Sequence, residues 1–213
     1  MDRITHLLCG EELVLLREKA ILWPSKKALI IADLHLGKVT HFRKAGIPLP
    51  KEIEKDNFDR FSYLLLNNEV EEVYILGDLF HSDYNDQWAR FIEFLALFPD
   101  LRFHLIMGNH DILPIDNYQA PNLNTYISYN CPPFSFTHKP TEHIEYYNMC
   151  GHIHPSIIMK GTGLQRLKLS CYHFGARSVI LPAFGAFTGT YSISPAKEDN
   201  VYVVTQDSIL KVV

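Results

Sequence analysis

Hydrophobic and polar positions follow two different patterns along the chain. In the first half, three short apolar runs have the character of strands buried inside a sheet: 27–32, 73–76 and 103–107. Between them, apolar residues recur at helical spacing after Pro50 and over 87–98. This β-α-β-α-β order implies parallel strands joined by right-handed helical crossovers. Residues 13–23 instead predict a β-hairpin that turns at 17–19.

From residue 124 onward, short β-rich runs alternate with turns that contain glycine and proline. The runs cover 134–137, 146–150, 157–159, 164–170, 179–181, 201–205 and 209–213. They predict a second sheet that is antiparallel or mixed. The expected fold class is therefore α/β, with two mixed β-sheets packed as a sandwich and flanked by helices. No linker marks a boundary, so we expect 1–213 to form a single domain.

Composition narrows the classes of protein that remain. The 213 residues are 47% hydrophobic and 21% charged, which excludes disordered, collagen-like and coiled-coil chains. No apolar run approaches the roughly 18 residues of a membrane span, and no secretory signal is visible, so we expect a cytoplasmic protein without membrane contact. The four scattered cysteines are expected to be free, buried thiols. A net charge of −4 argues against a purely electrostatic nucleic-acid binder.

Polar residues that can bind metals follow the apolar runs directly. In chain order they are Asp33-Leu34-His35, Gly77-Asp78, Gly108-Asn109-His110-Asp111, His138 and Gly151-His152-Ile153-His154. Ligands of α/β sheets gather outside the carboxyl ends of the strands, so we expect these residues to form one polar site. If the segment is extended, Asp33 and His35 share one side of it, as two ligands of one ion would. His152 and His154 repeat that spacing.

The donor set consists of carboxylate and amide oxygens and imidazole nitrogens, without sulfur. Such a set is suited to manganese, iron or zinc ions, and it differs from the cysteine-rich set of a structural zinc site. These side chains are too many for one catalytic ion that must keep an open position, so two ions are expected. Because a carboxylate can bridge two cations and an imidazole binds one, Asp78 is the expected bridging ligand. Any one of these residues alone would more often be a turn, cap or surface residue.

Together, these motifs resemble the complete signature of the calcineurin-like metallophosphoesterases. The resemblance implies two metal-binding groups that share one carboxylate: Asp33, His35, Asp78 and His154 in one, and Asp78, Asn109, His138 and His152 in the other. It also implies that His110 protonates the leaving group or stabilises developing charge, with Asp111 holding the His110 ring. The implied cofactors are two divalent ions, manganese first, with iron, zinc or magnesium as alternatives.

The chain also resembles a narrower group, the bacterial DNA-ligase-associated metallophosphoesterases, which are endonucleases of the DNA damage response. The segments that carry this resemblance are 32–38, 41–50, 77–82 and 181–189. It implies a phosphodiesterase or nuclease in DNA repair, working beside a ligase, a helicase and a second nuclease. The expected reaction is attack on phosphorus by a bridging hydroxide that two dications stabilise. The positive charge of the two dications would attract a phosphodiester to the site even though the protein has a net negative charge.

Two other functions stay open at this point. A small-molecule phosphoesterase, acting on cyclic nucleotides or nucleotide conjugates, would use the same metal ligands. A non-catalytic scaffold of the same fold would have lost ligands, and none is missing here. Candidates for substrate contact are His81, Lys38 and Arg43, although the last two also suit a solvated basic loop. Metal identity, DNA or RNA preference, endo or exo cleavage and oligomeric state stay undetermined.

Overall fold

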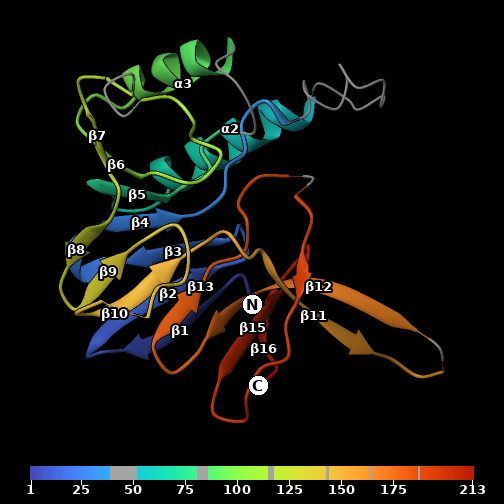
Figure 1. The fold of residues 1–213 in the computed structure, drawn as a ribbon. Helices are drawn as coiled ribbons and strands as arrows, with labels where there is room; N and C mark the ends of the chain where they lie inside the picture. Colours follow the sequence, from blue (N-terminus) through green and yellow to red (C-terminus); the bar gives the residue numbers. More distant parts are fainter. Residues whose placement is uncertain (39–51, 81–85, 115–117, 143, 164, 187) are drawn as a thin grey trace.

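Two β-sheets face each other in the computed structural model, which describes residues 1–38, 52–80, 86–114, 118–142, 144–163, 165–186 and 188–213 (Figure 1). The first sheet has the strand order β1-β2-β3-β4-β5-β6-β7. Its strands are β1 (Arg3–Leu8), β2 (Glu11–Leu16), β3 (Ala20–Trp23), β4 (Ala28–Ile31), β5 (Glu72–Leu76), β6 (Arg102–Ile106) and β7 (Leu123–Tyr126). Strands β1 to β4 pair antiparallel, whereas β4 to β7 pair parallel.

The second sheet has the order β14-β11-β12-β13-β10-β9-β8. In addition, β15 pairs with β12, and β16 pairs with β15. Its strands are β8 (Tyr129–Cys131), β9 (Phe134–Phe136), β10 (Tyr147–Cys150), β11 (Pro155–Lys160), β12 (Arg166–Phe174), β13 (Ser178–Ile180), β14 (Tyr191–Ser192), β15 (Asn200–Val204) and β16 (Ile209–Lys211). Strand β10 runs parallel to both β9 and β13, while β11 and β12 form an antiparallel hairpin. Both sheets are therefore mixed.

The described α-helices, α2 (Glu52–Leu66) and α3 (Asp86–Ala96), cover the face of the first sheet that is turned away from the second sheet (Figure 1). Their apolar residues, such as Phe61 and Phe91, pack with Phe103 of β6 in one core cluster. A second cluster, which includes Trp23 and Tyr172, fills the space between the sheets. The first cluster thus joins the helices to the first sheet, and the second joins the two sheets, as a layered α/β fold requires.

The sequence pattern predicted most of this architecture. The hairpin of β2 and β3, the parallel β4-α2-β5-α3-β6 unit and the sandwich are confirmed. Strands β1, β7, β8 and β14 were not predicted. Strand β1 lies at a sheet edge with alternating exposure, and β7 reads Leu-Asn-Thr-Tyr, so neither presents a continuous apolar run.

Two expectations drawn from composition concern membrane-spanning segments and the state of the cysteines. Neither described helix is long and apolar enough to cross a membrane. The four cysteines are free, as expected, but only Cys150 and Cys171 are buried. Cys9 is exposed in the turn between β1 and β2, and Cys131 is partly buried, so the prediction of four buried thiols was wrong.

Candidate metal centre

The predicted metal-binding residues come together where the carboxyl ends of parallel strands from both sheets meet. Each follows one strand: Asp33 and His35 follow β4, Asp78 follows β5, Asn109 follows β6, His138 follows β9, and His152 and His154 follow β10. The loops after β4 and β5 continue side by side, because His35 N–H donates to Asp78 O at 2.9 Å. The topology therefore delivers the clustering that the sequence predicted.

The backbone at this edge is strained. Of the eight described residues other than glycine that have a positive φ, five are predicted ligands: Asp33, His35, Asp78, His152 and His154. For residues with a Cβ atom, such angles cost about 1–3 kcal/mol each and persist only when the surroundings enforce them. The expectation that these segments are extended was therefore wrong. The left-handed conformation, and not the alternation of an extended strand, brings the Asp33 and His35 side chains to the same point.

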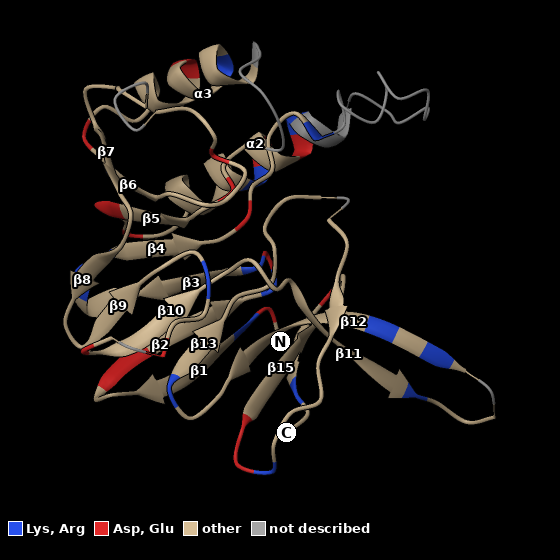
Figure 2. Ribbon diagram, viewed as in Figure 1, with Lys and Arg blue, Asp and Glu red and all other residues tan. Residues whose placement is uncertain are grey.

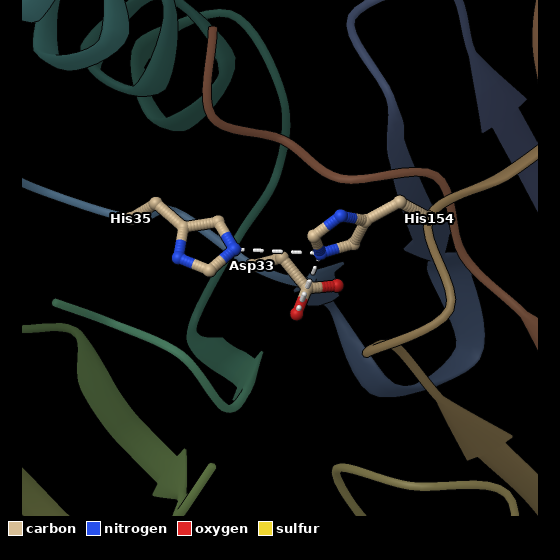
Figure 3. A group of neighbouring side chains, drawn as sticks. All are labelled: Asp33, His35 and His154. Carbon is tan, nitrogen blue, oxygen red and sulfur yellow. Dashed lines mark hydrogen bonds and ion pairs between the residues drawn. The ribbon is translucent and has the colours of Figure 1, made fainter. Parts of the chain in front are cut away.

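The first group of side chains is Asp33, His35 and His154 (Figure 3). His154 Nε2 lies 3.4 Å from both Asp33 Oδ1 and His35 Nε2. Asp33 and His35 are buried, and the outer ring nitrogen of His154, Nδ1, is 3.0 Å from the carbonyl oxygen of Gly189. A ring that donates from Nδ1 keeps the Nε2 lone pair free for a metal, which is a common arrangement around metal-binding histidines.

The second group is Asp78, His138 and His152, with Asn109 beside them. His138 Nε2 lies 3.3 Å from Asp78 Oδ1, 3.1 Å from His152 Nδ1 and 3.1 Å from Asn109 Oδ1. His138 Nδ1 faces the carbonyl oxygen of Leu76 at 3.0 Å, which again directs the other nitrogen inward. Burial and the neighbouring His138 ring lower the pKa of His152, which favours the neutral, ligating form.

His152 and His154 therefore belong to different groups, although their spacing suggested two ligands of one ion. The division agrees with the two sets that the family resemblance implied. Asp78 lies between the groups: its Oδ2 is 3.9 Å from His35 Nε2, while its Oδ1 contacts His138. That position suits the bridging role predicted for Asp78.

The charges of these residues test whether metal ions fit. Asp33 and Asp78 are 0% and 2% exposed, and neither forms an ion pair with a lysine or arginine among the described residues. A buried carboxylate is costly unless a positive charge or hydrogen bonds compensate it. Asp33 accepts the His152 N–H at 3.0 Å and Asp78 accepts the His110 N–H at 2.9 Å, but each carboxylate also faces imidazole nitrogens. Two divalent cations fit this donor set and would supply the missing positive charge.

Asp111 takes a different place from the one that the resemblance implied. Its carboxylate accepts three backbone N–H bonds, from Leu79 at 3.0 Å, Phe80 at 3.3 Å and Gly108 at 2.8 Å. Within the described residues these are the hydrogen bonds of the Asp111 carboxylate, and the His110 ring is not among its partners. Burial raises the pKa of Asp111 to about 6, although these bonds oppose the shift. Asp111 thus joins the loop after β5 to the loop after β6.

The remaining predicted residues lie around this centre or outside the described residues. The His110 side chain is 40% exposed, and its Nε2 is 4.0 Å from Asp78 Oδ2, so the ring borders the centre from the solvent side. Lys38 is half-buried; burial lowers its pKa, and the Asp33 and Asp78 carboxylates counteract that shift. His81 and Arg43 lie outside the described residues.

Helix α2 contributes two residues that the sequence analysis did not identify as part of the site. Buried Asn57 accepts the Ala186 N–H at 3.1 Å, and Arg60 donates to the carbonyl oxygen of Phe184. The same loop returns to the centre, where the Gly185 N–H donates to Asp33 O at 3.0 Å. The only sequence signal was a polar residue, Asn57, at an apolar position of the helix.

Comparisons with known proteins identify a family and a solved structure to which the chain is similar. The sequence model of the family described as calcineurin-like phosphoesterase matches residues 26–194. No curated protein matches the chain. Among solved structures, the crystal structure of Pseudomonas putida nuclease MPE is similar, with a TM-score of 0.79 and 27% sequence identity. The alignment covers 99% of this chain and 100% of that chain.

Proposed function

This chain belongs to the calcineurin-like phosphoesterase family, and we propose that it is a two-metal phosphodiesterase that cleaves polynucleotides in DNA repair. The family and the nuclease neighbour support a metal-dependent phosphoesterase. The observation that carries the proposal is the pair of adjoining carboxylate–histidine groups, one around Asp33 and one around Asp78. Two such groups, with a carboxylate between them, suit hydrolysis of a phosphoester at a pair of cations.

In the proposed arrangement, Asp33, His35 and His154 hold one cation, Asn109, His138 and His152 hold the other, and Asp78 is shared. Bound divalent cations would activate a water molecule and neutralise charge on the phosphoryl oxygens. The carbonyl oxygens of Leu76 and Gly189 fix the rings of His138 and His154. Because these rings are oriented in advance, the ligands need little rearrangement when metal binds.

His110 is the proposed proton donor to the leaving oxygen. The His110 ring lies at the solvent border of the centre, where a leaving group would depart. The backbone N–H of His110 donates to Asp78 Oδ1, which holds this loop against the shared carboxylate. Asp111 would act on His110 only through the backbone, by holding the loop of residues 108–111 against Leu79 and Phe80. Asp111 is thus a positioning residue in this proposal.

The proposed substrate is a polynucleotide, and the support comes from the setting of the centre and from the solved neighbour. A cavity of about 540 Å³, lined by Asn109, His138 and Lys139 among others, opens beside the second group of ligands. The structural similarity is to a protein described as a nuclease. A role beside a DNA ligase, a helicase and a second nuclease, with manganese as the metal, extends the proposal and rests on the sequence resemblance. A cytoplasmic location is also proposed, and it rests on the composition of the chain.

A substrate panel tests this function. The purified protein is incubated with labelled single- and double-stranded DNA and RNA, and with a cyclic nucleotide, in the presence of Mn²⁺, Mg²⁺ or Zn²⁺. We expect cleavage of a polynucleotide with a clear preference for one metal, strongest with Mn²⁺. Rapid turnover of the cyclic nucleotide without polymer cleavage would instead assign the centre to a small-molecule phosphoesterase.

A further inference from the structure

The chain has a net negative charge, but one region of it contains no acidic residues. Residues 146–197 contain no Asp or Glu, although the protein carries 24 of these residues. This region includes the hairpin of β11 and β12, which projects from the body of the molecule (Figure 1). In Figure 2 the hairpin shows bands of lysine and arginine and no acidic residue. Positive charge is therefore concentrated on one projecting element.

Three cations of the hairpin lie on one of its faces. In the antiparallel register, Lys160 is directly opposite Arg166 and Ile158 is opposite Lys168. Side chains of directly opposed residues and of alternate residues along a strand share a face, so Lys160, Arg166 and Lys168 point to the same side. Like charges placed opposite each other destabilise a sheet. Among the described residues, neither Lys160 nor Arg166 has an acidic partner to offset that repulsion.

The same face continues into a cavity at the base of the hairpin. Lys168 and Ser170 line a cavity of about 790 Å³, together with Arg17, Lys19 and Arg60. Its wall contains four cationic side chains against two acidic ones, Glu18 and Asp59. We name the cavity cations together with Lys160 and Arg166 the basic track.

Two cations in the cavity have donors without a protein partner. The Lys19 ammonium makes no hydrogen bond or ion pair within the described part of the chain, and Arg60 Nε is buried without an acceptor. Burial, followed by the repulsion of nearby Arg60, lowers the pKa of Lys19 to about 8. Arg60 Nε is enclosed by protein and out of reach of a ligand, but the Lys19 ammonium lines the cavity, and an unpaired, partly buried cation is costly unless a ligand accepts from it. An anion with several acceptor oxygens, such as a phosphate group, meets that requirement.

The basic track adjoins the metal centre at two points. Arg60 donates to the carbonyl oxygen of Phe184, one residue before Gly185, which bonds to Asp33. Lys168 Nζ donates to Thr190 O at 2.6 Å, next to Gly189, whose carbonyl oxygen holds the His154 ring. Strand β11 begins at the residue after His154. A bound polymer that extends from the metal centre along this strand would therefore contact the basic track.

We propose that the basic track binds the phosphodiester backbone of a polynucleotide whose scissile phosphate lies at the metal centre. This inference rests on the proposed function and specifies where the flanking phosphates bind. The six residues of β11 span roughly 20 Å, a length that corresponds to about six phosphate steps along one strand of a duplex. Backbone contacts of this kind would position the substrate without reading its sequence.

The test compares three proteins: the wild type, the variant Lys160→Gln/Arg166→Gln, and a control with the same loss of charge, Arg177→Gln/Lys211→Gln. Arg177 and Lys211 are exposed and lie outside the track. A fluorescent oligonucleotide with a phosphorothioate backbone, which resists hydrolysis, is titrated with each metal-loaded protein at several NaCl concentrations. Turnover of bis(p-nitrophenyl) phosphate and cleavage of ordinary DNA and RNA are measured in parallel. The variant Lys19→Gln tests the cavity separately.

We expect the hairpin variant to bind at least tenfold more weakly. The slope of log K against log salt should fall by about 0.7–0.9 for each phosphate contact that is lost. Turnover of the small diester should stay unchanged, and the control should behave as wild type. Lys19→Gln should also weaken binding, and its salt slope should fall by the amount expected for one lost phosphate contact. If Lys160→Gln/Arg166→Gln keeps the affinity and salt slope of the wild type, the track is wrong.

The outcomes separate this inference from the proposed function. A wild type that binds through the track, with the expected salt slope, but cleaves no polynucleotide would refute the nuclease function and support the track. A wild type that cleaves polynucleotides, with equal binding by the wild type and the hairpin variant, would support the function and overturn the track. If the protein neither binds nor cleaves polynucleotides, both are refuted.

Discussion

The substitution Gly151→Ala tests whether the position of the Asp33 carboxylate is essential. A Cβ atom at residue 151 would lie 2.4 Å from Asp33 Oδ2 and 2.8 Å from the Ala32 Cβ atom. Ordinary contacts of this kind begin at 3.4 Å, so the carboxylate would have to move by about 1 Å. Metal–ligand distances tolerate only about ±0.2 Å. The methyl group should therefore remove Asp33 from the first group of ligands without changing its chemistry.

The expected result has two parts. A displacement of about 1 Å in an active site can cost about 100-fold in rate, so turnover of a chromogenic phosphodiester should fall by at least that factor. The moved carboxylate also loses its bond from the His152 N–H, a charge-assisted bond worth roughly 1.5–3 kcal/mol. For a protein of this size, each kcal/mol lowers the melting temperature by about 2–4 °C.

The assays are bound metal per chain, phosphodiester turnover and thermal melting. Gly175→Ala is the matched control, because a Cβ atom there meets its nearest neighbour at an ordinary 3.6 Å and the residue is remote from the ligands. We expect the control to keep its metal and its activity. If Gly151→Ala binds as much metal as wild type and turns over at the same rate, the inferred placement of Asp33 as a ligand is refuted.

Three further predictions concern two residues of the centre, the support from helix α2, and the contacts of Glu72 in β5 with Arg102 and His104 in β6. Asp78→Asn and His110→Ala should each abolish turnover, and only Asp78→Asn should also lower metal content; near-normal rates in metal-replete buffer would contradict the assigned roles. Asn57→Ala should leave the Ala186 N–H without its acceptor, lower stability by about 1–3 kcal/mol in a melting experiment, and reduce activity less than Asp78→Asn does. Burial alone would raise the pKa of Glu72, but its bonds with Arg102 and His104 lower it overall. The stabilisation from Glu72 is therefore present above the unfolded pKa of about 4.3 and is lost as pH falls through the lower folded pKa, so wild type and Glu72→Gln should differ at pH 7 and converge in acid unfolding curves; a constant difference would exclude this linkage.

The site was predictable from the sequence because its residues follow buried strands. Runs such as 27–32 and 73–76 are apolar throughout, and the polar residues that follow Ile31 and Leu76 stand out against them. The order of the motifs then sufficed to group Asp33 with Asp78 and the histidines. What the sequence pattern did not contain was the backbone conformation, since an aspartate or histidine at positive φ has no local sequence signal.

Contacts made across the fold were the other limit of the sequence analysis. The bonds from Asp111 to Leu79 and Phe80 join residues about thirty positions apart, and the support from Asn57 to Ala186 spans more than a hundred. Such contacts follow from the packing of loops and helix, which no periodicity describes. Phe184 shows the same limit: the structure buries the side chain completely, with Arg60 over its ring at 4.1 Å.

Charge distribution was also hidden from a count over the whole chain. A net charge of −4 argued against nucleic acid, yet acids are missing from 146–197 and lysine and arginine gather on the β11–β12 hairpin (Figure 2). Electrostatic attraction in salt acts over about 8–10 Å, so the charges near a site matter more than the total. An acidic protein can therefore present a local surface that suits a polyanion.

Anomalous diffraction from crystals grown with Mn²⁺ tests whether two metal ions occupy the two groups of ligands. The two-metal arrangement predicts two anomalous peaks, one contacted by Asp33, His35 and His154 and one contacted by His138, His152 and Asn109, with Asp78 between them. A single peak, or none at these side chains in crystals of protein that hydrolyses phosphodiesters, would contradict it.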